Sequence, residues 1–237
     1  MAISTNPLAW LRSVQPRRAI ALLLLLLPLT VGAQTVRDLW LSMPPSFAPY
    51  LSTSLRTQCL DFYDMHTDAQ TDNALKGKSR IDTLTSTFLA ATLSKAHTLQ
   101  MKLLPASGSG LGSALGSGSG SSSSLSSCDS VLCVVRSWDG PKRDSEVQLF
   151  DRQWKPLQAP LTFSADSFVC RPDTMSEERF SRLVALLDPI MFSVSLSPAE
   201  NVLLVKLSPV VPNPEDEKAI EQILVQRKLK WDGKTFK

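Results

Sequence analysis

A tract of glycine and serine near the middle of the chain limits what this sequence can fold into. Residues 106–127 contain six glycines and no charged side chain. A stretch of this composition cannot bury enough apolar surface to offset the entropy lost on ordering it, so we expect a flexible linker there. The folded part must therefore be assembled from the segments on either side, residues 34–105 and 128–237. A linker of this kind leaves those segments free to pack together.

The first 33 residues have the pattern of a cleavable secretory signal peptide. Residues 1–18 contain three arginines and no acid, and an apolar run follows at 19–27. The run is too short to cross a bilayer as a stable helix, and the small or modest side chains at 31–33 favour cleavage before Gln34. We expect an exported protein, periplasmic or secreted, with no membrane span after cleavage. An uncleaved membrane anchor is the alternative interpretation.

The net charge of the chain changes once this segment is removed. The whole sequence has 25 basic and 22 acidic residues, and the three arginines of the segment account for the excess. The remaining chain is formally neutral, so its net charge gives no reason to expect nucleic acid or an anionic membrane as a partner. Removing 33 of 237 residues leaves 204, enough for one large domain or two small ones.

Four cysteines remain after cleavage, in a compartment where disulfides persist. They are Cys59, Cys128, Cys133 and Cys170, and they allow three disulfide connectivities among which the sequence does not choose. Cys59 continues a helical stripe of apolar residues and Cys133 lies between two valines on one face of an expected strand, which favours core positions for both. Since no C-x-x-C pair is present, redox catalysis and a zinc site have weak support.

Hydrophobic periodicity predicts an α+β fold on both sides of the tract. Apolar residues at helical spacing predict a helix at 51–62, and alternation predicts strands within 80–94 and at 98–104. The elements expected after the tract are a strand hairpin at 131–151, a helix capped by Thr174, strands at 191–196 and 202–207, a helix capped by Asn213 and a last strand through 229–231.

The two halves of the chain share a repeated pattern. Residues 93–105 align with 196–209 after one insertion, and a strand ending in Trp-Asp-Gly follows each copy, at 138–140 and 231–233. The inward positions that correspond are Leu99, Met101 and Leu103 with Leu203, Val205 and Leu207. Chance similarity is the alternative, because alternating strands are common. We expect two related units of helix plus antiparallel sheet, packed as one body and joined through the flexible Gly/Ser loop.

No motif for catalysis, a cofactor or a metal outweighs its structural explanation. His66 and His97 are the only histidines, and His97 is expected in a solvated turn between two strands. His66 lies among aspartates, which suggests a calcium loop that begins at Asp64. Such a loop would have Ala69 where glycine is needed and Leu75 where a bidentate glutamate belongs. We therefore assign no catalytic, cofactor-binding or metal-binding residue.

Three tryptophans are the best candidates for a binding surface. Trp138, Trp154 and Trp231 lie at expected strand ends, and tryptophan is favoured at binding contacts, although packing in a core or at a sheet edge is its commoner use. We expect a non-enzymatic protein of the cell envelope that binds or scaffolds an envelope protein or a glycan. The alternative is an unrecognised periplasmic hydrolase, which would need a deep pocket where acids converge on His66.

A series of short motifs runs in order along the chain. The motifs are WLSMPPSFAPYL at 40–51, LDFY at 60–63, GKS at 77–79, TLQMKLLP at 98–105, FDRQWKPL at 150–157 and WDGKTF at 231–236. Together they resemble DUF3256, an exported Bacteroidales family of unknown function, over essentially the whole chain after the signal peptide. The resemblance implies an exported α+β protein of a Gram-negative envelope, with no known activity, cofactor or catalytic residue. The Gly/Ser insertion departs from the family, as does the turn WDGPKRD at 138–144, near which relatives have cysteines.

The resemblance also implies a lineage that attaches glycans in the periplasm, at Asp followed by Ser or Thr and then an aliphatic residue or threonine. The sequence offers three such sites, at Thr83, Ser130 and Thr174. Thr174 is already expected to cap a helix, and Thr83 follows an aspartate expected in a strand turn. Ser130 adjoins the tract, where an enzyme could reach an extended backbone, so we expect it to be the best of the three sites.

Overall fold

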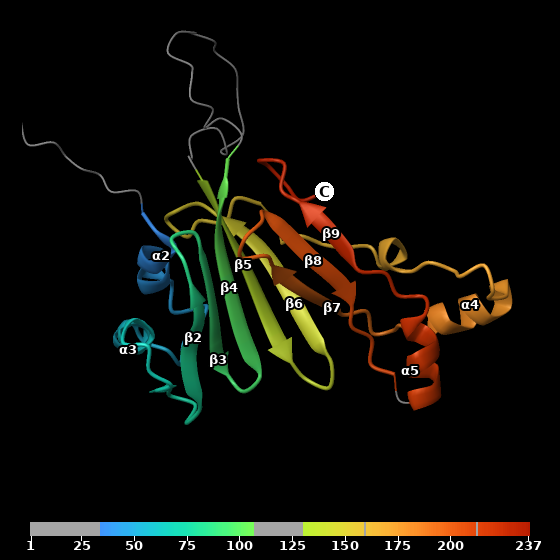
Figure 1. Ribbon diagram of the computed structural model, residues 1–237, viewed down its shortest axis with the longest axis horizontal. Helices are drawn as coiled ribbons and strands as arrows, with labels where there is room; N and C mark the ends of the chain where they lie inside the picture. Colours follow the sequence, from blue (N-terminus) through green and yellow to red (C-terminus); the bar gives the residue numbers. More distant parts are fainter. Residues whose placement is uncertain (1–33, 107–129, 159, 212) are drawn as a thin grey trace, which may run out of the picture. The chain divides into compact units, whose positions relative to one another are not determined.

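The chain folds into helices packed on antiparallel sheets, as the periodicity predicted (Figure 1). The computed structural model describes residues 34–106, 130–158, 160–211 and 213–237. The expected signal peptide, the Gly/Ser tract beyond Ala106 and Cys128 lie outside the described residues. Ala106 itself is buried, so the first residue of the expected linker belongs to the folded part. Within the described ranges, no helix is long and apolar enough to cross a membrane.

A six-stranded antiparallel sheet contains most of the strands. Its strands follow chain order, as β1 (Thr71–Asp72), β2 (Lys78–Leu84), β3 (Phe88–Ser94), β4 (His97–Pro105), β5 (Ser130–Asp139) and β6 (Arg143–Phe150). The expected hairpin is present as β5 and β6, but β5 pairs with β4 along its whole length. The hairpin therefore extends the first sheet instead of belonging with the second unit. The tract joins two neighbouring strands of this sheet and does not join the two units.

Two helices cover one face of this sheet. The first, α2 (Val36–Ser42), was not predicted from the sequence and begins with a capping box between Thr35 and Asp38. The second, α3 (Thr53–Asp64), corresponds to the helix expected at 51–62 and is capped by Ser52. The core that these helices form with the sheet includes Leu39, Trp40, Cys59, Leu60, Leu89, Met101, Leu132 and Val134.

The other face of the first sheet packs against a second sheet of three antiparallel strands. Its strands are β7 (Phe192–Leu196), β8 (Val202–Leu207) and β9 (Arg227–Lys230), with β8 in the middle. Further elements that pack around this second core are η3 (Ala165–Phe168), α4 (Glu177–Ala185) and α5 (Pro214–Glu221). The core includes Val131, Cys133, Val135, Val147, Leu183, Leu203, Val205 and Ile220.

The repeat is visible in the order and register of the strands. Strands β3, β4 and β5 follow one another in the first sheet as β7, β8 and β9 do in the second. Trp138 lies opposite His97, and the backbone N–H of Trp231 donates to the carbonyl of Asn201, which corresponds to His97 in the aligned repeat. The connection from β8 to β9 contains α5, whereas the connection from β4 to β5 contains the tract. The chain thus consists of two related units packed as one body.

The start of α4 differs from the sequence expectation. Ser176 caps the helix by accepting a hydrogen bond from the backbone N–H of Arg179, and Thr174 lies exposed in the preceding turn. Met175 is buried in the second core, so the chain turns inward there and the helix begins only after it. Asn213 caps α5 as expected, since its side-chain oxygen accepts from the first turn of that helix.

Candidate functional site: a row of side chains around Trp138

The three candidate tryptophans lie in different environments. Trp138 is 39% exposed at the end of β5, whereas Trp154 is buried. Trp231 is half-buried, and its indole N–H donates to the carbonyl oxygen of Pro105 at 2.7 Å. Among the three, only Trp138 combines substantial exposure with an indole ring that is packed against charged and aromatic neighbours.

Trp138 belongs to a continuous series of packed side chains, which we call the Trp138 row. Its members, in spatial order, are Trp154, Phe47, Arg136, Trp138, His97 and Tyr50. The guanidinium carbon of Arg136 lies 5.0 Å from the ring centre of Phe47 and 5.4 Å from that of Trp138. His97 stacks on Trp138 with ring centroids 5.4 Å apart and planes 7° from parallel. Stacking and cation–π contacts thus hold the Trp138 ring in one orientation.

The register of the strands explains why these side chains meet. Arg136 and Trp138 are two residues apart in β5, so both point to the sheet face on which α2 and α3 lie. His97, the first residue of β4, is directly opposite Trp138, and Glu146 of β6 is opposite Arg136, with which it forms an ion pair. Phe47 comes from the segment between α2 and α3, so the row joins both β-strand and loop residues.

His97 is buried, so the expectation of a solvated turn was wrong. The turn comprises only residues 95–96, and β4 begins at His97, whose ring is covered by Tyr50 and Trp138. The Nδ1 atom of His97 lies 2.5 Å from the Tyr50 hydroxyl, while its Nε2 atom is buried without a hydrogen-bond partner among the described residues. Burial, with a smaller effect from the charge of Arg136, lowers the pKa of His97 and favours the neutral imidazole.

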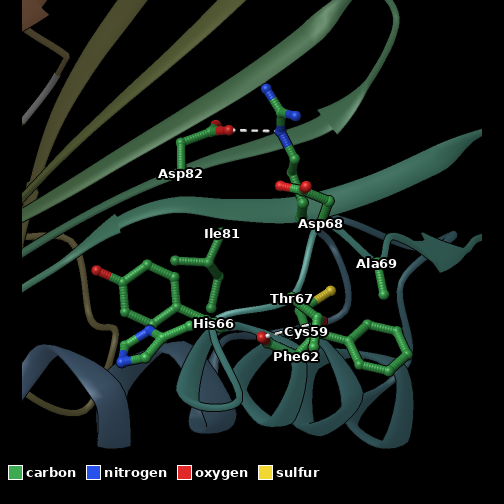
Figure 2. Close-up of a pocket in the computed structure, with 10 residues that line it drawn as sticks. Cys59, Phe62, His66, Thr67, Asp68, Ala69, Ile81 and Asp82 are labelled. Atoms are coloured by element: carbon green, nitrogen blue, oxygen red, sulfur yellow. Dashed lines mark hydrogen bonds and ion pairs between the residues drawn. The ribbon is translucent and has the colours of Figure 1, made fainter.

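A cavity of about 330 Å³ lies between the end of α3 and strand β2, and His66 lines it (Figure 2). Asp82 is held there by the Nε of Arg80 at 2.7 Å and by the hydroxyl of Thr92 at 2.8 Å. Figure 2 shows the His66 ring directed away from Asp68 and Asp82. Among the described residues, no acid accepts a hydrogen bond from His66, and no group of three or more His, Cys, Asp or Glu could hold a metal ion. Among the described residues that line the cavity, His66 thus has no hydrogen-bonded acid of the kind that orients a catalytic histidine.

The three expected modification sites differ in accessibility. Ser130 is buried at the start of β5, where its hydroxyl accepts a hydrogen bond from Arg152 at 3.0 Å. Thr83 is half-buried in β2, and Thr174 is exposed in the turn before α4. An enzyme that modifies folded protein would thus reach Thr174 more easily than Ser130, although Ser130 was the preferred site from the sequence. Modification at each position stays a prediction.

Two of the three described cysteines are core residues. Cys59 and Cys133 are buried in the two cores, as the sequence pattern predicted, and Cys170 is exposed. These three form no disulfide with one another, and Cys128 lies outside the described residues. Burial raises the pKa of the Cys59 and Cys133 thiols, which keeps both protonated and unreactive.

Comparison with known families establishes what the chain is related to. A family model described as "Protein of unknown function (DUF3256)" matches residues 28–111 and 123–236. The chain belongs to the DUF3256 family. This DUF3256 protein is also similar to a solved domain of an uncharacterized protein from Porphyromonas gingivalis, with 21% sequence identity and a TM-score of 0.58. That match covers 85% of this chain and 98% of the other, and it shows a shared fold. A search of curated proteins found no match.

In this DUF3256 protein, Trp138 was expected from the sequence as a binding candidate, whereas its partners Phe47, Tyr50 and Arg136 were not. The alternation of Arg136 and Trp138 in an expected strand was a usable signal, because residues two apart in a strand share a face. The stacking of His97 on Trp138 could not be predicted from the sequence, because it depends on which residue of β4 lies opposite Trp138. That register is fixed only when the whole sheet forms.

Proposed function

We propose that this DUF3256 protein is exported and serves in the cell envelope as a non-enzymatic binding protein, with the Trp138 row as its contact surface. One observation carries the proposal: Trp138 is 39% exposed although His97 and Arg136 hold its ring in place. A large ring that is already ordered loses little conformational entropy when a partner covers it, which favours affinity.

An envelope protein is the partner we favour over a glycan. Tryptophan, tyrosine and arginine dominate the binding energy of protein interfaces, and the Trp138 row contains all three. The ion pair of Arg136 with Glu146 lies beside the ring and would form part of the polar rim of such an interface. The alternative function, a periplasmic hydrolase, has no comparable support, because the described residues around His66 include no hydrogen-bonded acid–histidine pair.

Binding of the purified protein to isolated cell envelopes tests the surface. We expect Trp138→Ala to lower the bound fraction about tenfold or more, as truncation of an interface hot spot does. Met65→Ala is the matched control, because it removes a 59% exposed apolar side chain on another part of the surface, and it should bind as wild type does. Equal binding of wild type and Trp138→Ala would refute the proposed surface.

The same assay identifies the class of partner. Envelopes treated with protease should lose Trp138-dependent binding, and envelopes treated with periodate, which cleaves sugar diols, should keep it. Loss of binding after periodate alone would show that the partner is a glycan and not a protein.

Export has its own test, at the N-terminus of the protein isolated from cells. We expect mass spectrometry to find Gln34 as the first residue, because small side chains precede it after a short apolar run. Recovery of peptides that contain Met1 or the arginines of residues 1–18 would refute export by cleavage.

A further inference from the structure

The basic residues of the chain are unevenly distributed. Residues 34–237 are formally neutral, with 22 basic and 22 acidic side chains, yet residues 227–237 contain five basic side chains and one acid. The side chains of residues 227–237 thus have a net charge of five minus one, or +4. Acidic side chains in residues 34–226 compensate this charge. The net charge of the chain does not reveal this uneven distribution of basic side chains. Their positions on the surface follow from the fold.

The strand register places the lysines on one face of the second sheet. Lys228 of β9 is opposite Leu204 of β8, and Lys230 is opposite Val202. Side chains two apart in a strand share a face, so Lys206 of β8 lies on this face as well. We call these three residues, Lys206, Lys228 and Lys230, the lysine face. The alternate positions Leu203, Val205 and Leu229 point the other way, into the second core.

The three lysines of this face are exposed and only partly neutralised, whereas Val202 on the same face is buried. Lys206, Lys228 and Lys230 are all exposed, and α4 and α5 pack into the core on the opposite side of the sheet. Glu200 pairs with Lys228 at 2.6 Å, whereas Lys206 and Lys230 form no ion pair within the described residues. Lys237, which the backbone of Lys230 holds beside β9, adds a further positive charge that Asp232 balances at 2.5 Å.

We propose that the lysine face binds the surface of an anionic membrane. Three observations favour a membrane over a discrete anion. The cations are lysines, which act as hydrated point charges and lack the planar fork with which arginine clamps a single carboxylate or phosphate. They project from the face of a sheet and so can contact many headgroups at once. Half-buried Leu204 lies between Lys228 of β9 and Ser195 of β7, so the face also presents an apolar side chain beside its lysines. The proposal is independent of the Trp138 row.

Sedimentation with lipid vesicles tests the proposal, using the protein from residue 34 onward because both cores lie within it. We expect binding to vesicles that contain roughly 30% phosphatidylglycerol and none to vesicles of phosphatidylcholine alone, since each lysine near an anionic surface contributes about fivefold to binding. The triple substitution Lys206→Gln, Lys228→Gln, Lys230→Gln should then lower binding about a hundredfold. Raising the salt from about 0.05 M to about 1 M should abolish wild-type binding, because the Debye length shrinks to about 3 Å.

A matched triple substitution controls for net charge. Lys76→Gln, Lys78→Gln and Lys155→Gln remove three exposed lysines from other surfaces and should leave vesicle binding unchanged. Thermal unfolding of both triple variants checks that the fold is retained. Equal vesicle binding by the two variants would overturn the proposal. Lysine-dependent binding to a soluble acidic polysaccharide such as alginate, without binding to the anionic vesicles, would also overturn it.

Discussion

Lys102 lies buried on the face of β4 that meets the second sheet, where backbone oxygens hold its ammonium group. Its Nζ donates to the carbonyls of Ser197, Pro198 and Glu200 at 2.6, 3.1 and 2.7 Å. Burial lowers the pKa of Lys102, because the charged form loses its hydration there. One side chain of the first sheet thus donates three hydrogen bonds to the turn between β7 and β8.

Substitution of Lys102 measures the strength of this link. We expect Lys102→Met to lower the free energy of unfolding by about 2 kcal/mol, because three carbonyls lose their donor while the buried charge disappears and offsets part of the loss. Lys155→Met, at an exposed position, should change stability by less than about 0.5 kcal/mol. Urea unfolding monitored by fluorescence gives both values, and an unchanged midpoint for Lys102→Met would contradict the assigned role.

His97 should make the stability of the protein depend on pH. Its folded pKa is lowered below the ordinary value of 6.5, so the unfolded chain binds a proton at a pH where the folded chain does not. Stability should therefore fall as the pH drops below about 6.5, until the folded pKa is reached. Urea unfolding at about pH 7.5 and about pH 5.5 should show a smaller loss for His97→Gln than for wild type. Equal losses would exclude His97 as the titrating group.

At the scale of helices and strands, correct prediction from the sequence depended on helix-capping residues and on the alternation of apolar and polar side chains. Asn213, which Pro214 follows directly, was assigned correctly as a cap, as were the alternating strands β7 and β8. Thr174 was expected to cap α4, but Ser176 caps it, because the burial of Met175, a tertiary effect, delays the start of the helix. The site followed the same rule, since the sequence offered three candidate tryptophans but showed neither which of them is exposed nor which residue lies opposite Trp138.

The two hydroxyls before α4 give a direct test of this assignment. We expect Ser176→Ala to destabilise the protein by about 1 kcal/mol, because the backbone N–H of Arg179 loses its acceptor. Thr174→Ala should have almost no effect, since Thr174 is exposed in the preceding turn. Melting temperatures of the two variants, measured side by side, decide the matter, and a larger decrease for Thr174→Ala would restore the original assignment.

At the scale of the whole molecule, strand β5 ties the two cores together. Its alternate residues Leu132 and Val134 belong to the core under α2 and α3, while Val131, Cys133 and Val135 belong to the core shared with the second sheet. Neither core can lose β5 without exposing apolar side chains of the other. The two related units should therefore behave as one thermodynamic domain.

We expect a single unfolding transition for the protein from residue 34 onward. Val134→Ala and Val135→Ala each create a cavity, one in either core, and each should lower the same midpoint. Tryptophan fluorescence, to which Trp40 in the first core contributes, should change together with far-ultraviolet circular dichroism, which reports on both units. Two separated transitions, each shifted by only one of the substitutions, would show that the units unfold independently.

Strand β5 begins beside the end of β4, with Pro105 paired to Ser130. The entropy of closing a loop between two such positions grows only logarithmically with its length, by about 0.6 kcal/mol for each doubling, so the cost of a longer insertion rises slowly. This position is therefore suited to protein engineering: a fluorescent protein inserted between residues 106 and 130 would leave both cores untouched and would report where in a living cell the protein resides.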